Sequence, residues 1–141
     1  MEVNRCLKDK AMDYIDHALG RPVDPLGETY RQHYVINDDS DLAAELRASS
    51  HWSEGMRTAG LAGTFCFFSV TNDGRKALKD HLNAIGDKHR KFVVHFAGVD
   101  IATVATSRSK ARYRAYLDAS ECLDDLTFND FCRRSRVRLA T

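Results

Sequence analysis

Four arginines lie close together near the C-terminal end of the sequence: Arg133, Arg134, Arg136 and Arg138. The planar guanidinium group pairs with phosphates and with carboxylates, so four of them in six residues indicate contact with an anion. The residue type does not say which anion. A solubilising C-terminal tail has the same composition, and both interpretations stay open.

A second basic set has a cation at every second position: Arg108, Lys110, Arg112 and Arg114. On a helix these side chains spread over an arc of about 200°, so they form two i,i+4 pairs rather than a single stripe. Arg75 and Lys76 add two cations at the start of another predicted helix. All six are candidate anion or nucleic-acid contacts, and the alternative for the second set is a solvated helix face.

Acidic side chains surround a different predicted helix: Asp38, Asp39, Asp41 and Glu45, opposed only by Arg47. A helix that reads DNA must approach phosphates, which an acidic surface repels. We therefore expect these four residues to form a face that binds a protein partner rather than the major groove.

The motifs of common enzyme classes are missing. The sequence has no GxGxxG or GxxxxGK[ST] loop, no HExxH, no HxE followed by PCxxC, and no CxxC among its four cysteines. Cys66 with His95 would be a nucleophilic pair if their strands were neighbours, but Cys66 in an apolar run is better explained as a buried thiol. We expect a protein that is not an enzyme, with no catalytic residue, no metal site and no cofactor.

The composition is that of an ordinary globular protein, with 43% hydrophobic and 29% charged residues among 141. The net charge of +1 hides a division, because residues 1–70 carry 7 basic and 11 acidic side chains and residues 71–141 carry 14 and 9. No apolar run reaches the roughly 18 residues of a membrane span, and no export signal opens the sequence. We expect a cytoplasmic protein without a membrane partner, and a homodimer stays open.

Periodicity and turn residues predict the elements of the first part. These are helices over 5–19, over 26–35 and from 41 to about 50, a hairpin or wing around Gly55, Gly60 and Gly63, a strand over 64–70 buried on both faces, and a helix ending near 85. Trp52 stands in a polar stretch, where it is a lid over the core or an interface anchor. We favour the lid, because a tryptophan brings a large apolar area.

The second part alternates strand and helix signals. Strands are predicted over 91–96 and 101–106 with a turn at 97–100, followed by a helix from Ser107 or Ser109 to about Cys122. Tyr113, Tyr116, Leu117 and Leu123 are expected to pack that helix on the hairpin. Thr127 caps a short last helix, and the basic tail becomes a strand edge or a frayed arm.

These elements predict an α+β protein. Residues 1–88 are interpreted as a winged-helix-like part in the order helix, helix, helix, wing, helix, and residues 89–141 as a module of a β-hairpin and two helices. We expect the two to pack as one compact unit. Fold analogy of this kind does not by itself assign a function.

Three segments carry a resemblance: Glu28–Tyr34, Phe68–Arg75 and Ser107–Tyr113. They resemble small accessory proteins of temperate phages and bacterial prophages, over nearly the whole chain. The Phe-x-Val-Thr-x-x-Gly-Arg pattern of the second segment also resembles the wing strand and following helix of winged-helix regulators. The resemblance implies a non-enzymatic phage gene product that acts in the host cytoplasm, and the acidic third helix departs from DNA-binding winged helices.

Two functions follow as hypotheses. The first is an accessory factor that binds a host protein as an adaptor or inhibitor, for example of a defence complex, as anti-CRISPR proteins do. The second is a winged-helix regulator that contacts nucleic-acid phosphates through its basic C-terminal half.

Overall fold

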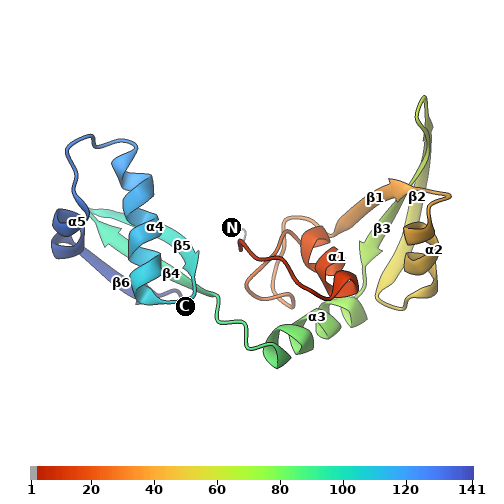
Figure 1. Cartoon of the computed structure of the whole chain (residues 1–141), viewed down its shortest axis with the longest axis horizontal. Coiled ribbons are helices and arrows are strands. Elements are labelled where there is room, and N and C mark those ends of the chain that lie inside the picture. The colour runs from red at the N-terminus through yellow and green to blue at the C-terminus, as the bar shows by residue number, and fades with distance from the viewer. Residues whose placement is uncertain (1–2) are drawn as a thin grey trace. The chain divides into compact units, whose positions relative to one another are not determined.

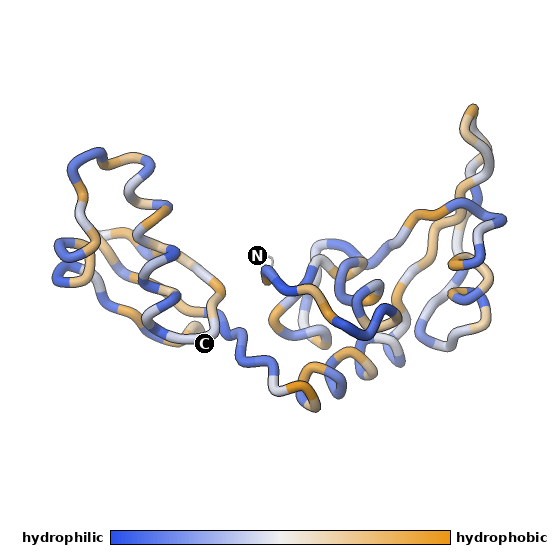
Figure 2. The backbone as a smooth tube through the Cα atoms, in the orientation of Figure 1, coloured by the Kyte–Doolittle hydropathy of each residue, from blue (hydrophilic) through white to orange (hydrophobic). Residues whose placement is uncertain are grey.

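The computed structural model describes residues 3–141 and shows an α+β protein of five helices and two three-stranded antiparallel sheets. The chain divides into two compact units, residues 4–87 and residues 88–141, and residue 3 belongs with the second (Figure 1). Apolar stretches are short in both (Figure 2), and no helix within residues 3–141 is long and apolar enough to cross a membrane. The predicted α+β class is confirmed.

The N-terminal unit contains three helices and three strands. Their bounds are α1 Lys10–Ala18, β1 His33–Asn37, α2 Asp41–Ala48, β2 Trp52–Gly60, β3 Gly63–Val70 and α3 Asn72–Ala84. The strand order is β1-β3-β2, and the β2–β3 hairpin projects beyond β1 as an arm (Figure 1). Asp9, Ser40 and Thr71 cap the three helices, because each side chain accepts a hydrogen bond from the backbone N–H three residues later.

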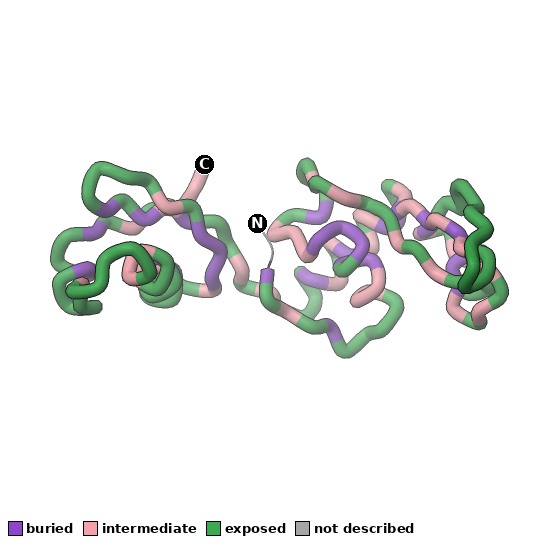
Figure 3. Tube along the Cα trace, turned by 90° about the horizontal axis from the view of Figure 1, so that it is seen from above, coloured by how far each residue is buried: buried purple, intermediate pink, exposed green. Residues whose placement is uncertain are grey.

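The core of this unit lies on one face of its sheet. Cys66, Phe68 and Val70 alternate along β3 and are buried with Ile15 of α1 and Leu78 of α3. Buried positions lie along the strands and helices and also in irregular segments, as at Leu7 and Pro25 (Figure 3). The strand was predicted to be buried on both faces, which is wrong, because its other side is only partly covered.

Trp52 is buried in this core, with 8% of its surface exposed. Its ring meets Tyr34 edge-on at 6.2 Å between centroids. The lid interpretation is therefore confirmed, and an exposed interface anchor at Trp52 is ruled out.

The helix predicted over 26–35 is wrong. An irregular stretch leads into β1, in which Tyr34 and Ile36 face the core in the two-residue alternation of a strand. The expected order helix, helix, helix, wing, helix is therefore not formed. Strand β1 separates α1 from α2, and α2 is followed directly by β2 rather than by another helix. A helix-turn-helix reader needs two consecutive helices at this point.

The C-terminal unit is built from β4 Arg90–Phe96, β5 Val99–Ala105, α4 Arg108–Ser120, α5 Phe128–Arg134 and β6 Ser135–Leu139. The strand order is β5-β4-β6, so the chain returns after both helices to pair β6 with the central strand. Ser107 and Thr127 cap α4 and α5 as predicted. The basic tail is a strand edge rather than a frayed arm.

Helix α4, together with Phe131 of α5, covers one face of this second sheet. Phe92, Val94 and Phe96 pack against Ala111 and Ala115 of α4, whose small side chains let the helix approach the strands closely. Of the four residues predicted to pack α4 on the hairpin, Tyr116 does pack against this core. The prediction is wrong for the other three, because Tyr113, Leu117 and Leu123 are 48%, 45% and 48% exposed.

Candidate functional site

The opposite face of the second sheet is the candidate site. Cross-strand partners share a face, and the register pairs His95 with Asp100 and Arg136, and Val93 with Ala102 and Arg138. We call this surface the basic sheet face, and it consists of Lys91, Val93, His95, Asp100, Ala102, Arg136 and Arg138. Of these seven residues Val93 is partly buried and the other six are exposed. Val104, which pairs with Lys91 on the same face, is fully buried, so the face is covered at that end.

Asp100 organises the cations around it. Its Oδ1 lies 2.7 Å from Nδ1 of His95, and its Oδ2 lies 3.5 Å from Nη2 of Arg138. The hydrogen bond with His95, aided by the charge of Arg138, holds the pKa of the Asp100 carboxyl below its ordinary value of 3.8. Asp100 is therefore ionised at neutral pH and orients both neighbours.

The electrostatic balance of this region is strongly positive. Residues 88–141 carry 11 Lys and Arg against 6 Asp and Glu. On the basic sheet face itself, Lys91, Arg136 and Arg138 oppose Asp100 alone. The face therefore attracts an extended anion more than a single isolated one, since its cations are spread over two strands.

The structure divides the predicted arginine cluster into two pairs. Arg136 and Arg138 project from β6 onto the basic sheet face. Arg133 and Arg134 belong to α5, where Arg133 pairs with Asp130 at 3.6 Å and Arg134 lies 5.1 Å from the centre of the Phe96 ring. The second pair is therefore not part of the face.

The second basic set lies on α4, against the other side of the sheet. Arg108 Nη1 donates to the Val137 carbonyl at 2.8 Å, and Arg114 Nη1 donates to the Val104 carbonyl at 2.6 Å. Arg112 is partly buried and Lys110 is exposed. Two of these four predicted anion contacts thus tie the helix to strand backbone.

Arg75 is similarly occupied. Its guanidinium donates to the carbonyls of Pro25 and Gly27 and to the side chains of Thr29 and Gln32, at 3.0 to 3.5 Å. These long-range bonds hold the irregular stretch before β1 in place. Lys76 is exposed on α3 of the N-terminal unit, whereas the basic sheet face belongs to the C-terminal unit.

The predicted acidic face is partly neutralised. Asp38 pairs with Arg47 and with Arg57, and Glu54 pairs with the same two arginines at 3.2 and 2.7 Å. Hydrogen bonds from Arg57 and Arg47 lower the pKa of Glu54. Sequence reasoning missed Glu54 and Arg57 because they lie on β2, well beyond the acidic run. Asp39, Asp41 and Glu45 remain exposed.

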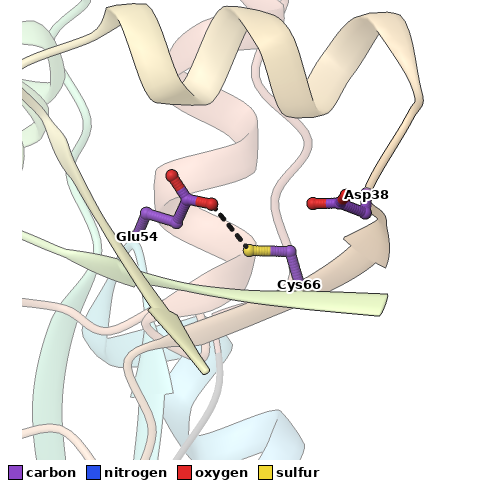
Figure 4. A group of neighbouring side chains, drawn as sticks. All are labelled: Asp38, Glu54 and Cys66. Atoms are coloured by element: carbon purple, nitrogen blue, oxygen red, sulfur yellow. Dashed lines mark hydrogen bonds between the residues drawn. The ribbon is translucent and has the colours of Figure 1, made fainter. Parts of the chain in front are cut away.

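The buried thiol of Cys66 lies beside this charge cluster (Figure 4). Its Sγ is 3.6 Å from Glu54 Oε1, and one oxygen each of Asp38 and Glu54 lies within 4.8 Å of the sulfur and of the other. Two carboxylates and a thiol are possible metal ligands. Here a cation would face the two guanidinium groups that already bind both carboxylates, so the cluster is better explained as an ion-pair network.

Cys66 and His95 lie in different sheets, so neighbouring strands do not bring together the nucleophilic pair considered from the sequence. Cys66 is fully buried, as the thiol interpretation expected.

The exposed aromatic side chains of the C-terminal unit lie away from the basic sheet face. Tyr113 on α4 and Phe128 on α5 meet edge-on at 5.4 Å and line a hollow of about 480 Å³ with Ser109, Lys110 and Arg114. The hollow is on the helix side of the sheet, so it does not add stacking surfaces to the face.

Comparison with known proteins gives no assignment. No protein family matches this chain, and neither curated proteins nor solved structures include a significant match.

Proposed function

We propose that this protein binds nucleic acid through the basic sheet face, without catalysing a reaction. The observation that carries the proposal is the placement of Arg136, Arg138 and Lys91 on a sheet face that no helix of its unit covers. Of the two functions that the sequence suggests, this is the second, with the contact narrowed from the basic C-terminal half to one face of its sheet.

The distribution of charge favours a polyanion. Small anions are held by convergent donors in a concave site, whereas the cations of this face stand side by side on two strands. A nucleic-acid backbone presents phosphates at regular intervals, which matches such an array. The surplus of cations in residues 88–141 adds a field that attracts the same partner.

Fluorescence anisotropy with random-sequence duplexes, at low and moderate salt, tests the proposal. We expect affinity to fall steeply with salt. On random duplexes, which offer no selected site, Arg136 and Arg138 are free to neutralise phosphates, so the double variant Arg136→Ala/Arg138→Ala should flatten the log–log slope by about 2, close to one for each phosphate that the variant no longer neutralises. The double variant Lys76→Ala/Arg133→Ala removes the same charge elsewhere and should bind closer to the parent. Absence of binding at low salt, or equal weakening by both double variants, contradicts the proposal.

A second candidate function is the binding of a host protein, as in a phage accessory factor. It is supported by the three acidic residues that stay exposed, Asp39, Asp41 and Glu45. Their joint replacement by lysine should remove a co-purifying host protein, while lysines at Asp124 and Asp125 should not. Asp38 is left unchanged, because its ion pairs with Arg47 and Arg57 are part of the fold. Equal recovery of the host protein with both variants argues against the acidic face.

A further inference from the structure

We infer that the basic sheet face takes duplex DNA, with the β4–β6 ribbon in the major groove and Arg136 and Arg138 at base edges. This inference rests on the proposed function and names the form of nucleic acid and the manner of reading. Four features of the face support it.

The first feature is the chemistry of the face. Single strands are held by aromatic side chains on which successive bases stack. The seven residues of the basic sheet face include no Phe, Tyr or Trp, and the exposed rings of Tyr113 and Phe128 lie on the helix side. A face of cations around the small apolar Val93 and Ala102 suits base edges and thymine methyl groups rather than unstacked bases.

The second feature is width. Neighbouring strands lie about 5 Å apart, and the major groove of B-DNA, about 12 Å wide, admits a two-stranded ribbon. Strand β6 is at the edge of the sheet and pairs with β4, so these two strands can lie in the groove with the basic sheet face toward the base pairs. The minor groove is about 6 Å wide, and the major groove of duplex RNA is too narrow for side chains to read.

The third feature is spacing along the strand. Arg136 and Arg138 are two residues apart on the same face, which places them about 6.7 Å apart along β6. Two base-pair steps of B-DNA rise by about 6.8 Å. The two guanidinium groups therefore match bases two steps apart, and guanine is the expected base, because its O6 and N7 accept both arms of the guanidinium.

The fourth feature is Asp100. A carboxylate directed at phosphates weakens binding, yet Asp100 lies within the basic sheet face and holds His95 and Arg138. At base edges the same carboxylate is useful, because it orients an arginine and accepts a hydrogen bond from cytosine N4. The position of Asp100 thus favours contact with bases over contact with the backbone alone.

Selection from a random duplex pool, followed by competition binding, tests the inference with the full chain. We expect enrichment of sites containing guanine, and binding of the selected duplex at least tenfold tighter than binding of its single strand or of the same sequence as duplex RNA. Replacing the guanines by 7-deazaguanine, which lacks the N7 acceptor, should weaken binding about tenfold.

Charge-preserving variants separate reading from attraction. Arg136→Lys and Arg138→Lys keep the charge but lack the two-armed donor, so we expect them to lose preference for the selected site and to keep affinity for random duplex. Arg133→Lys on α5 is the matched control and should keep the preference. Circular dichroism verifies that each variant is folded.

The outcomes distinguish the inference from the proposed function. Equal binding of single strands, of duplex RNA or of the 7-deazaguanine duplex overturns the groove assignment while nucleic-acid binding stands. A pool without enriched guanine sites overturns it as well. Failure to bind any of these nucleic acids at low salt removes the proposed function and the inference together.

Discussion

His95 and Asp100 face each other across the β4–β5 ladder, with Nδ1 of the histidine 2.7 Å from Oδ1 of the aspartate. The other oxygen of the same carboxylate lies 3.5 Å from the guanidinium of Arg138 on β6. The single acidic group of the basic sheet face is thus engaged with two of its neighbours, and its negative charge is directed at them rather than at an incoming anion.

Replacing Asp100 by asparagine should separate attraction from discrimination. The Asp100→Asn variant gains one positive charge, so binding of random duplex should tighten, while Arg138 loses its ionic partner and preference for a selected site should fall. Asp118→Asn, an equal change in charge on α4, should tighten random binding and keep the preference. Competition anisotropy measures both quantities, and an unchanged preference in Asp100→Asn would contradict a role in orientation.

Acid should weaken the N-terminal unit through Asp13. Partial burial raises the pKa of this carboxyl, but hydrogen bonds from Arg21 and from the Leu7 backbone outweigh it, so the folded-state pKa lies below 3.8. The stabilisation is therefore present above pH 3.8 and is lost as the pH falls through the lower folded value. In urea unfolding from pH 6 to pH 2, the unfolding free energy of Asp13→Asn should fall less steeply with acid than that of the parent. Asp9→Asn is unsuitable as a control, because Asp9 caps α1. If the unfolding free energy falls equally in both proteins, groups other than Asp13 cause the sensitivity to acid.

The ion pair of Asp16 with Arg5 is the most buried in the described residues. Asp16 is fully buried and accepts from Arg5 Nε and Nη2 at 2.9 and 2.6 Å, and also from Arg21 at 3.2 Å. Asp16→Ala leaves the Arg5 charge buried without this partner, so we expect a loss of about 3–5 kcal/mol in unfolding free energy. The fluorescence of Trp52, the sole tryptophan, reports unfolding of this unit.

A double-mutant cycle verifies the coupling of that pair. Arg5→Met/Asp16→Leu should be less unstable than the sum of the two single variants, since neither charge then stays buried alone. Additive effects within about 0.5 kcal/mol would show that the two side chains act independently.

Gly74 should not tolerate a side chain. A Cβ at this position would lie 2.5 Å from the His51 carbonyl oxygen and 2.9 Å from Val70 Cγ1, at the start of α3. Alanine normally stabilises a helix relative to glycine. We nevertheless expect Gly74→Ala to lower the unfolding free energy by about 1–3 kcal/mol, because the clash outweighs the gain in helix propensity. Gly27→Ala, whose Cβ meets nothing closer than 3.4 Å, is the control. Thermal unfolding followed at Trp52 compares the two variants, and a stabilised Gly74→Ala would refute the packing argument.

Much of the local structure follows from neighbouring residues. Ser107 and Thr127 cap helices where their types predict it, and the alternation of Phe92, Val94 and Phe96 marks β4. These features depend on hydrogen bonds and periodicity within a few residues, which a sequence displays directly. The α+β class and the buried state of Cys66 and Trp52 were predictable for the same reason.

The candidate site depended on pairings between distant segments. Only the register of β6 with β4 separates Arg136 and Arg138 from Arg133 and Arg134, and only the fold brings Asp100 to Arg138. The helix expected over 26–35 does not form, because residues of β1 pair with β3 instead. Most of these pairs join residues more than thirty positions apart in the sequence.

The sequence by itself thus determined the helix caps, most strands and a surplus of cations in the second half. The tertiary structure decided which of those cations face solvent together and which, like Arg75 and Arg114, are used to hold backbone carbonyls. The physical reason is that a guanidinium is equally suited to a phosphate and to a carbonyl oxygen, so its role is set by the groups that folding places within hydrogen-bonding distance.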